Sequence, residues 1–191
     1  MAPLTAMTGA KPELRKSAAQ RRAAAHALDP AAAAGRLRDH GMAALGRYSF
    51  AVFSGYWPIR SEIDPRPLML GLAESGRLCC LPAVIGPGVL QFRAWDHREA
   101  LVDGPLGTSH PSETGAVALP DLLLVPLLAF DRRRQRLGYG AGHYDATLTA
   151  LRAEKPVLAV GVAYAAQEVP EVPTDPWDQP LDLILTEAEI I

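Results

Sequence analysis

The hydrophobic pattern of this chain divides it into alanine-rich helical segments and short apolar strands. Residues 10–28 and 30–45 predict helices, because alanine is the strongest helix former. Asp29 followed by Pro30 is typical of a helix N-cap with proline in the first turn. Further helices are predicted over residues 66–75 and 143–153, and strands over residues 48–54, 78–84, 89–95, 122–125, 157–164 and 183–186.

The order of these segments indicates the α/β class, with a mainly parallel central sheet. Most strands are apolar without strict alternation and are separated by helices, as in sheets covered on both faces. We therefore expect a single-domain, three-layer α/β/α fold over residues 10–191, preceded by a flexible extension at residues 1–9. Ligands bind such sheets beyond the carboxyl ends of the strands. The segments 54–62, 126–142 and 164–178 follow strands and are expected to converge at that rim.

Composition narrows the class of protein further. The 191 residues are 49% hydrophobic and 21% charged, which is ordinary for a soluble globular protein. The net charge of −2 argues against a nucleic-acid or membrane-surface partner. No apolar run reaches the roughly 20 residues of a membrane span. The only cysteines, Cys79 and Cys80, are adjacent and would point to opposite faces of a strand, so we expect reduced core residues in a cytoplasmic protein.

A glycine-rich turn is the most informative motif. An apolar strand at 122–125 ends before Pro126, which has no N–H to donate and is expected to stop the ladder. An arginine-rich loop follows, and then glycines at 138, 140 and 142 lead into a helix. Free backbone N–H groups and a helix dipole together favour phosphate. The motif lacks the Gly-Lys-Ser/Thr of a Walker A loop, and His143 replaces the third glycine of a dinucleotide motif.

The whole segment around this turn resembles the signature of the 5-formyltetrahydrofolate cyclo-ligase family. The matching residues are, in order, Pro126, Ala129-Phe130-Asp131 and the run Arg136–Asp145 (RLGYGAGHYD). The resemblance extends from Lys11 to Thr186. It implies a fold like that of the NagB/RpiA/CoA-transferase group. It also implies ATP-dependent conversion of 5-formyltetrahydrofolate to 5,10-methenyltetrahydrofolate, with release of ADP and phosphate. ATP and Mg²⁺ would be the cofactors, and the partners would be small molecules. We expect a monomer or weak homodimer.

The resemblance also implies the residues of the nucleotide site. Lys11 and Arg15 match positions that contact ATP phosphates, and at a spacing of four residues they share a helix face. Arg21 or Arg22 could join them, and the spacing leaves both open. The expected nucleotide-binding residues are Lys11, Arg15, Arg136, Leu137, Gly138, Tyr139, Gly140, Ala141, Gly142, His143 and Tyr144, with Lys11 and Arg136 as catalytic cations.

Two carboxylates and one loop complete the expected site. By resemblance, Asp145 and Asp178 would hold the metal, which suits the preference of Mg²⁺ for carboxylate oxygens. Tyr56, Trp57 and Glu62 would bind the folate, with the Glu62 carboxylate accepting a forked pair of hydrogen bonds from the pterin. Three aromatic side chains could line an apolar slot for the ring, and a glutamine matches the family near the rim: Trp57, Phe92 and Trp95, and Gln167.

Several positions depart from the family pattern and leave a second hypothesis open. Arg134 replaces a usual glycine in the turn, and the other departures are His110, Ala141, His143, Ala146 and Trp177. The glycines at 138, 140 and 142 are retained, so the departures affect the folate side more than the nucleotide side. The alternative is therefore a nucleotide-binding module of the same fold that has lost folate turnover.

Overall fold

A six-stranded sheet in the order β10-β9-β6-β1-β2-β3 runs through the middle of this computed structural model, which describes residues 10–191. All neighbouring strands are parallel except β2 and β3, which form an antiparallel pair. The strands are β1 (Val52–Ser54), β2 (Leu78–Ala83), β3 (Gln91–Ala94), β6 (Leu122–Pro126), β9 (Leu158–Val162) and β10 (Leu183–Leu185). The predicted mainly parallel sheet is confirmed.

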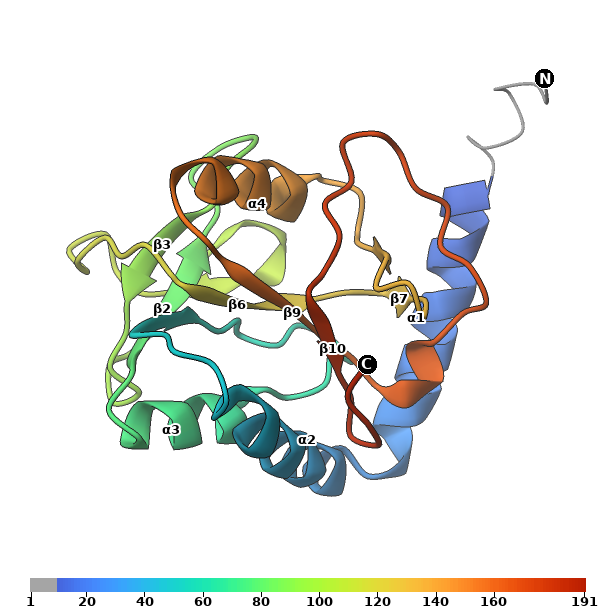
Figure 1. Ribbon diagram of the computed structural model, residues 1–191, viewed down its shortest axis with the longest axis horizontal. Helices are drawn as coiled ribbons and strands as arrows, with labels where there is room; N and C mark the ends of the chain where they lie inside the picture. Colours follow the sequence, from blue (N-terminus) through green and yellow to red (C-terminus); the bar gives the residue numbers. More distant parts are fainter. Residues whose placement is uncertain (1–9) are drawn as a thin grey trace.

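Helices cover both faces of this sheet and complete the three layers (Figure 1). α4 (His143–Glu154) lies on one face, where Leu148 is fully buried in a core cluster with strand residues. α2 (Pro30–Leu45) and α3 (Arg66–Glu74) lie on the other, where Leu37 and Leu68 are fully buried in a second cluster. The α/β/α architecture therefore has one apolar core on each side of the sheet.

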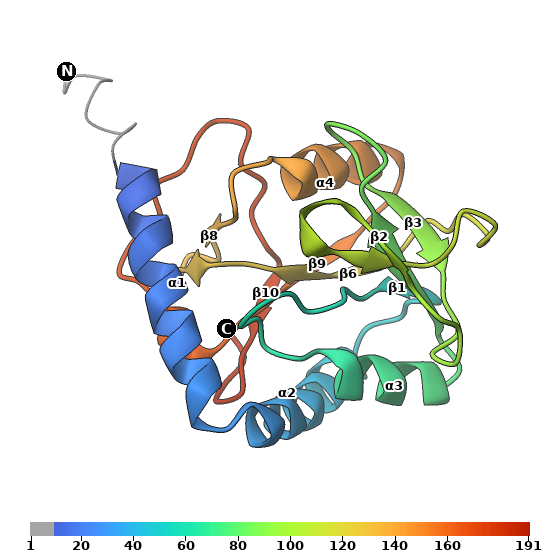
Figure 2. The ribbon, with the colours of Figure 1, turned by 180° about the vertical axis from the view of Figure 1, so that it is seen from behind.

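The helix α1 (Ala10–Leu28) stands apart from these layers, at one end of the sheet (Figures 1 and 2). It packs against a small hairpin, β7 (Ala129–Phe130) with β8 (Arg136–Leu137), through a third cluster that includes Ala18. It also lies against the 3-10 turn η3 (Ala165–Gln167). This packing places the cationic face of α1 beside the segment that follows β8.

The structure differs from the sequence prediction mainly in the irregular segments. The bounds of α1 and α2 agree with prediction, but the first strand covers only Val52–Ser54 because the residues from Tyr48 to Ala51 lie outside the ladder, most of them exposed. Pro126 is the last residue of β6, paired in register with Val162, so the ladder extends one residue further than predicted.

Two short hairpins were missed. The segment 126–142 contains β7 and β8, and the segment 96–118 contains β4 (Val102–Asp103), the 3-10 turn η2 (Pro105–Gly107) and β5 (Ser109–His110). Strands of two residues leave no periodic signal in a sequence. The expected extension at residues 1–9 lies outside the described residues. None of the described helices has the length and apolarity of a bilayer span.

Candidate functional site

The glycine turn between β8 and α4 is the centre of the candidate site. Gly140 has φ +102° and Gly142 has φ +71°, a backbone region that favours glycine. Gly142 is the N-cap of α4, and no side chain caps this end of the helix. The first-turn N–H groups therefore have no side-chain partner and are directed, with the positive end of the helix dipole, toward the turn. Such a helix end is suited to an anion.

Arg15 of α1 lies directly on this turn. Its Nε donates to the carbonyl of Gly138 at 3.0 Å. A Cβ built on Gly140 would lie 3.3 Å from the Arg15 guanidinium carbon, so a side chain there would press on the guanidinium and displace it by a few tenths of an ångström. Neither terminal nitrogen of Arg15 makes a hydrogen bond to another residue in the described part of the chain. They remain available to a ligand on the turn.

Lys11, one helical turn before Arg15, is held by two carboxylates of the C-terminal loop. Its Nζ lies 2.6 Å from Oδ2 of Asp175 and 2.8 Å from Oδ2 of Asp178. Partial burial opposes the charge of the ammonium, but the hydrogen bonds to both carboxylates outweigh this effect and raise the pKa of Lys11. The ammonium is therefore charged at neutral pH. The structure brings Lys11 and Asp178 together and adds Asp175, which the sequence did not indicate.

Arg136 is buried and forms the corresponding pair with Asp145. Its Nη2 lies 2.6 Å from Oδ1 of Asp145, and its other terminal nitrogen donates to the carbonyl of Gln179. The N–H of Gln179 donates to the same Oδ1 at 2.9 Å. Asp145 is thus tied to the residue next to Asp178. The two expected metal carboxylates are therefore neighbours, and each one faces one of the expected catalytic cations.

Each of these two carboxylates retains one oxygen for another ligand. Oδ2 of Asp145 and Oδ1 of Asp178 make no hydrogen bond to another described residue. Over residues 10–191, no group of three or more acidic, histidine or cysteine side chains is arranged to enclose a metal. This donor set fits Mg²⁺, which commonly binds one or two carboxylates and fills its other positions with phosphate oxygens and water.

Glu62, in the loop after β1, contacts the glycine turn through the side chain of Tyr139. It is only 5% exposed, and burial raises its pKa above the usual value despite its hydrogen bonds. Its Oε1 accepts from the Tyr139 hydroxyl at 2.6 Å, and its Oε2 accepts from the N–H of Ile59 at 2.9 Å. Nη1 of Arg22, another buried residue, lies 3.7 Å from Oε1 and also donates to the Tyr139 hydroxyl.

The other expected folate residues have different environments. Tyr56 is buried, and its hydroxyl donates to the carbonyl of Ile63 at 2.9 Å. This hydrogen bond joins the two ends of the loop between residues 56 and 63. The ring of Trp57 packs edge-on against Trp95, with centroids 5.8 Å apart. Phe92 belongs to the core on the other face of the sheet, so it does not line a slot with these two tryptophans.

The side chains of three further expected nucleotide-site residues have different environments. Nδ1 of His143 lies 2.8 Å from the carbonyl of Gly88. Leu137 is buried in the cluster under α1, so it can offer only backbone groups to a nucleotide. Tyr144 packs against the core beneath α4, where burial raises the pKa of its hydroxyl and the nearby Glu62 carboxylate acts in the same direction. Gln167 is buried and has a structural role, because its side-chain amide donates to the carbonyls of Leu127 and Leu128.

The arginine-rich loop is structural rather than free. Arg132 pairs with Glu168 and Glu189, and Arg133 pairs with Asp131. Arg134 has φ +63°, which explains why a glycine is the usual residue at this position of the family pattern. Of the loop's four arginines, Arg136 is the one that reaches the glycine turn.

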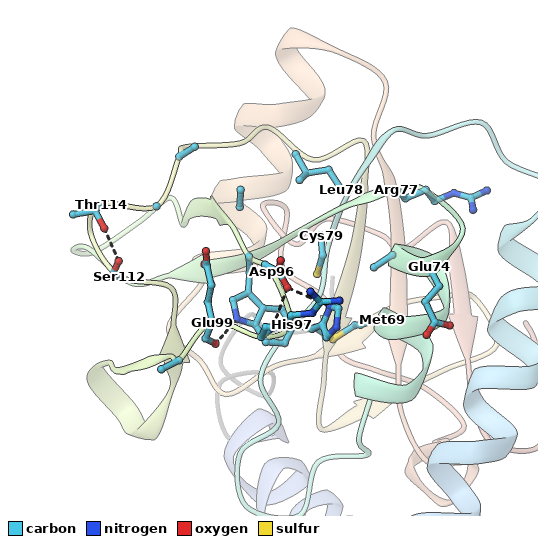
Figure 3. A pocket seen from close by; sticks show the side chains of 17 residues that line it. Met69, Glu74, Arg77, Leu78, Cys79, Asp96, His97, Glu99, Ser112 and Thr114 are labelled. Carbon is cyan, nitrogen blue, oxygen red and sulfur yellow. Dashed lines mark hydrogen bonds and ion pairs between the residues drawn. The ribbon is translucent and has the colours of Figure 1, made fainter.

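A cavity of about 900 Å³ lies elsewhere, between α3 and the β2–β3 end of the sheet (Figure 3). Cys79, Trp95 and His97 line it, and none of the residues expected to bind the nucleotide does. A second cavity of about 590 Å³ lies beside Phe50 and Lys155, also away from the glycine turn. The candidate site is therefore an open turn of backbone donors and ion pairs, and we locate it by these groups rather than by cavity size.

Sequence reasoning left Arg22 undecided and omitted Asp175. Arg22 follows Lys11 by about three full helical turns, which places the two on one face, whereas Arg21 is rotated well away. The helical period could therefore have selected Arg22. Asp175 gave no such signal, because its contact with Lys11 joins opposite ends of the chain.

Comparison with known proteins gives one consistent family match. A sequence model described as the 5-formyltetrahydrofolate cyclo-ligase family matches residues 7–187. The 5-formyltetrahydrofolate cyclo-ligase of Escherichia coli (strain K12) is 33% identical over 149 residues, covering 75% of this chain and 80% of that protein. A protein of the same name from Haemophilus influenzae is 48% identical over 65 residues, 34% of each chain.

Two solved structures have a similar fold. The 5,10-methenyltetrahydrofolate synthetase of Mycoplasma pneumoniae gives a TM-score of 0.75 at 24% identity, covering 93% of this chain and 99% of that one. The 5,10-methenyltetrahydrofolate synthetase of Aquifex aeolicus gives a TM-score of 0.72 at 31% identity, covering 94% and 91%. The similarity therefore includes all three layers and α1.

Proposed function

The chain belongs to the 5-formyltetrahydrofolate cyclo-ligase family, and we infer that it is the ATP-dependent ligase that converts 5-formyltetrahydrofolate to 5,10-methenyltetrahydrofolate, with release of ADP and phosphate. The family match over residues 7–187 carries this conclusion, because it includes both α1 and the glycine turn. The substrates are accordingly small molecules. The geometry supports the same conclusion, since groups suited to phosphate and a carboxylate suited to folate meet at one turn.

The triphosphate would lie on the glycine turn. The uncapped N-terminus of α4 supplies backbone donors, and the terminal nitrogens of Arg15 face the same turn. Lys11 adds a second cation from α1, and its ammonium can meet charge that develops on a transferred phosphoryl group. Charge stabilisation by fixed donors of this kind is usually the largest contribution to phosphoryl transfer.

Asp145 and Asp178 would hold Mg²⁺ through their unbonded oxygens, and the ion would neutralise charge on the phosphates. Arg136 supports this role, since its contact with Asp145 fixes the direction of that carboxylate. We therefore assign Arg136 to positioning, in addition to the positive charge it adds beside the turn. The contact of Lys11 with Asp178 has the same effect on that carboxylate.

The folate would enter from the side of Glu62. In the reaction, the formyl oxygen of the substrate takes the γ-phosphoryl group, which makes that oxygen a good leaving group. The N10 nitrogen then attacks the formyl carbon and closes the five-membered ring. N10 loses its proton to solvent, and the C–O bond breaks with departure of phosphate, which leaves the methenyl bridge. The protein contributes orientation of the two substrates, which is worth several kcal/mol when the reacting atoms are held at about 3–3.5 Å. No covalent bond to the enzyme is required.

A direct assay tests this function. Purified protein is incubated with ATP, Mg²⁺ and 5-formyltetrahydrofolate, and the near-ultraviolet absorbance of the methenyl product is followed. Product that forms only when all components are present supports the ligase. ATP binding without product would instead favour the alternative, a nucleotide-binding module that has lost folate turnover.

We also propose a cytoplasmic location and a monomeric or weakly dimeric state. Cys79 and Cys80 are free and buried, as expected in a reducing compartment, and burial raises the pKa of the Cys79 thiol to about 12. Light scattering coupled to size-exclusion chromatography tests the oligomeric state.

A further inference from the structure

Tyr139 connects the nucleotide turn to the folate loop through its side chain. Its backbone lies between Gly138 and Gly140, within the turn expected to hold phosphate. Its hydroxyl leaves the turn and donates to Oε1 of Glu62 at 2.6 Å. The same hydroxyl accepts from Arg22, whose Nε donates to Ser61 in the loop of Glu62 at 3.2 Å. Tyr139 therefore links the glycine turn, to which it belongs, with the loop of Glu62 and with α1.

The hydrogen bonds of Glu62 leave its carboxylate ready for a forked donor. Each carboxylate oxygen can accept about two hydrogen bonds. Oε1 accepts one from Tyr139, and Oε2 accepts one from the N–H of Ile59. One acceptor position per oxygen remains, which matches two adjacent N–H donors such as those of a pterin. Tyr139 and Ile59 thus fix the plane in which Glu62 would receive the ligand.

Arg22 strengthens this arrangement. It is 3% exposed, and Glu62 is 5% exposed, so their charges interact with little screening by solvent. The guanidinium carbon of Arg22 also lies 5.5 Å from the centre of the Tyr139 ring. Because Arg15 touches the glycine turn from the same helix, α1 supports both ends of the connection.

We propose that Tyr139 is a positioning residue that couples the two substrates, so that nucleotide on the glycine turn increases the affinity of Glu62 for folate. A nucleotide that orders the glycine turn would also fix the Tyr139 hydroxyl. That hydroxyl orients the Glu62 carboxylate through its hydrogen bond. By reciprocity, folate increases nucleotide affinity by the same factor. This inference rests on the proposed function, because it takes Glu62 as the folate acceptor.

Calorimetry tests the coupling. The dissociation constant of 5-formyltetrahydrofolate is measured with and without a non-hydrolysable ATP analogue and Mg²⁺. In the wild-type protein the analogue should tighten folate binding by about 5–150-fold, the usual range of such couplings. In Tyr139→Phe the ratio should fall to near one, while the analogue alone still binds within about threefold of wild type. Tyr48→Phe is the matched control, since Tyr48 is exposed and far from the turn, and it should retain the wild-type ratio.

The outcomes separate this inference from the proposed function. If the wild-type protein forms the methenyl product and Tyr139→Phe keeps the full coupling ratio, the inference is overturned and the proposed function stands. A wild-type ratio of one also overturns the inference. Wild-type protein that binds no 5-formyltetrahydrofolate overturns the proposed function and the inference together. A double-mutant cycle with Glu62→Gln adds a further check, because the Tyr139 effect should vanish when Glu62 is already changed.

Discussion

The ammonium of Lys11 lies 2.8 Å from Oδ2 of Asp178. This contact joins the first turn of α1 to the loop before β10, so the expected catalytic cation and an expected metal ligand are neighbours. Asp175 completes the contact at 2.6 Å. A triphosphate with its metal would find a cation and a carboxylate already side by side. The same relationship identifies Lys11 as the α1 residue whose loss should affect chemistry.

Lys11→Ala should lower kcat by about 10²–10³, because a fixed donor to developing charge typically contributes that much. Lys16→Ala is the matched control, since Lys16 is an exposed lysine of the same helix and surface changes usually stay within about 0.5 kcal/mol. Arg22 cannot serve as the control because it is buried beside Glu62. Steady-state kinetics at saturating Mg²⁺ measures the effect, and wild-type turnover in Lys11→Ala would remove Lys11 from the reaction.

Glu62→Gln should weaken 5-formyltetrahydrofolate binding by about 1.5–3 kcal/mol, the value of a charge-assisted hydrogen bond. The amide keeps a single acceptor oxygen and loses the charge, so it cannot receive a forked donor pair on two oxygens. ATP affinity should stay near wild type. Isothermal titration of each ligand measures both values, with Glu74→Gln, an exposed glutamate of α3, as the control. Unchanged folate affinity would remove Glu62 from the site.

Gly140→Ala should reduce ATP affinity on the order of tenfold, about 1.4 kcal/mol. The new Cβ would meet the Arg15 guanidinium at 3.3 Å and would sit at φ +102°, which disfavours alanine. Gly76→Ala is a matched control for strain, since Gly76 has φ +90° and open space around it. Both variants should lose about 1–2 kcal/mol of unfolding free energy. Equal ATP affinities in the two variants would make the turn purely structural.

Folate affinity should fall as the pH is lowered toward the pKa of Glu62, which burial raises above its usual value of 4.5. A protonated carboxyl group loses its charge and one acceptor position. The hydrogen bond from Tyr139 favours the ionised form, so Tyr139→Phe should raise this pKa further and start the loss of affinity at a higher pH. Binding measured between about pH 5 and pH 8 shows the shift. Glu62→Gln should show no such pH dependence of folate affinity. If wild type and Tyr139→Phe lose folate affinity over the same pH range, the hydrogen bond from Tyr139 does not influence the pKa of Glu62.

The sequence by itself determined the helices, the sheet type and the chemical groups of the site. Local signals suffice for these: alanine content and the Asp29–Pro30 cap set the bounds of α1 and α2, and apolar runs located the six strands of the central sheet but not the two-residue strands of the hairpins. Gly140 and Gly142 have positive φ angles that favour glycine, and the glycine repeat could be recognised in the sequence. The spacing of Lys11 and Arg15 placed both on one helix face.

Only the tertiary structure decided which charges meet. The contacts of Lys11 with Asp178, of Arg136 with Asp145 and of Tyr139 with Glu62 join residues from different elements. Such contacts depend on how α1, the glycine turn and the loops after β1 and β9 pack together, and no local pattern encodes that packing. Burial has the same origin: Arg22 reads as a surface arginine of a polar helix, yet the loop of Glu62 and the side chain of Tyr139 enclose it. A side chain's exposure and partner are properties of the assembled core, because both depend on surfaces supplied by distant residues.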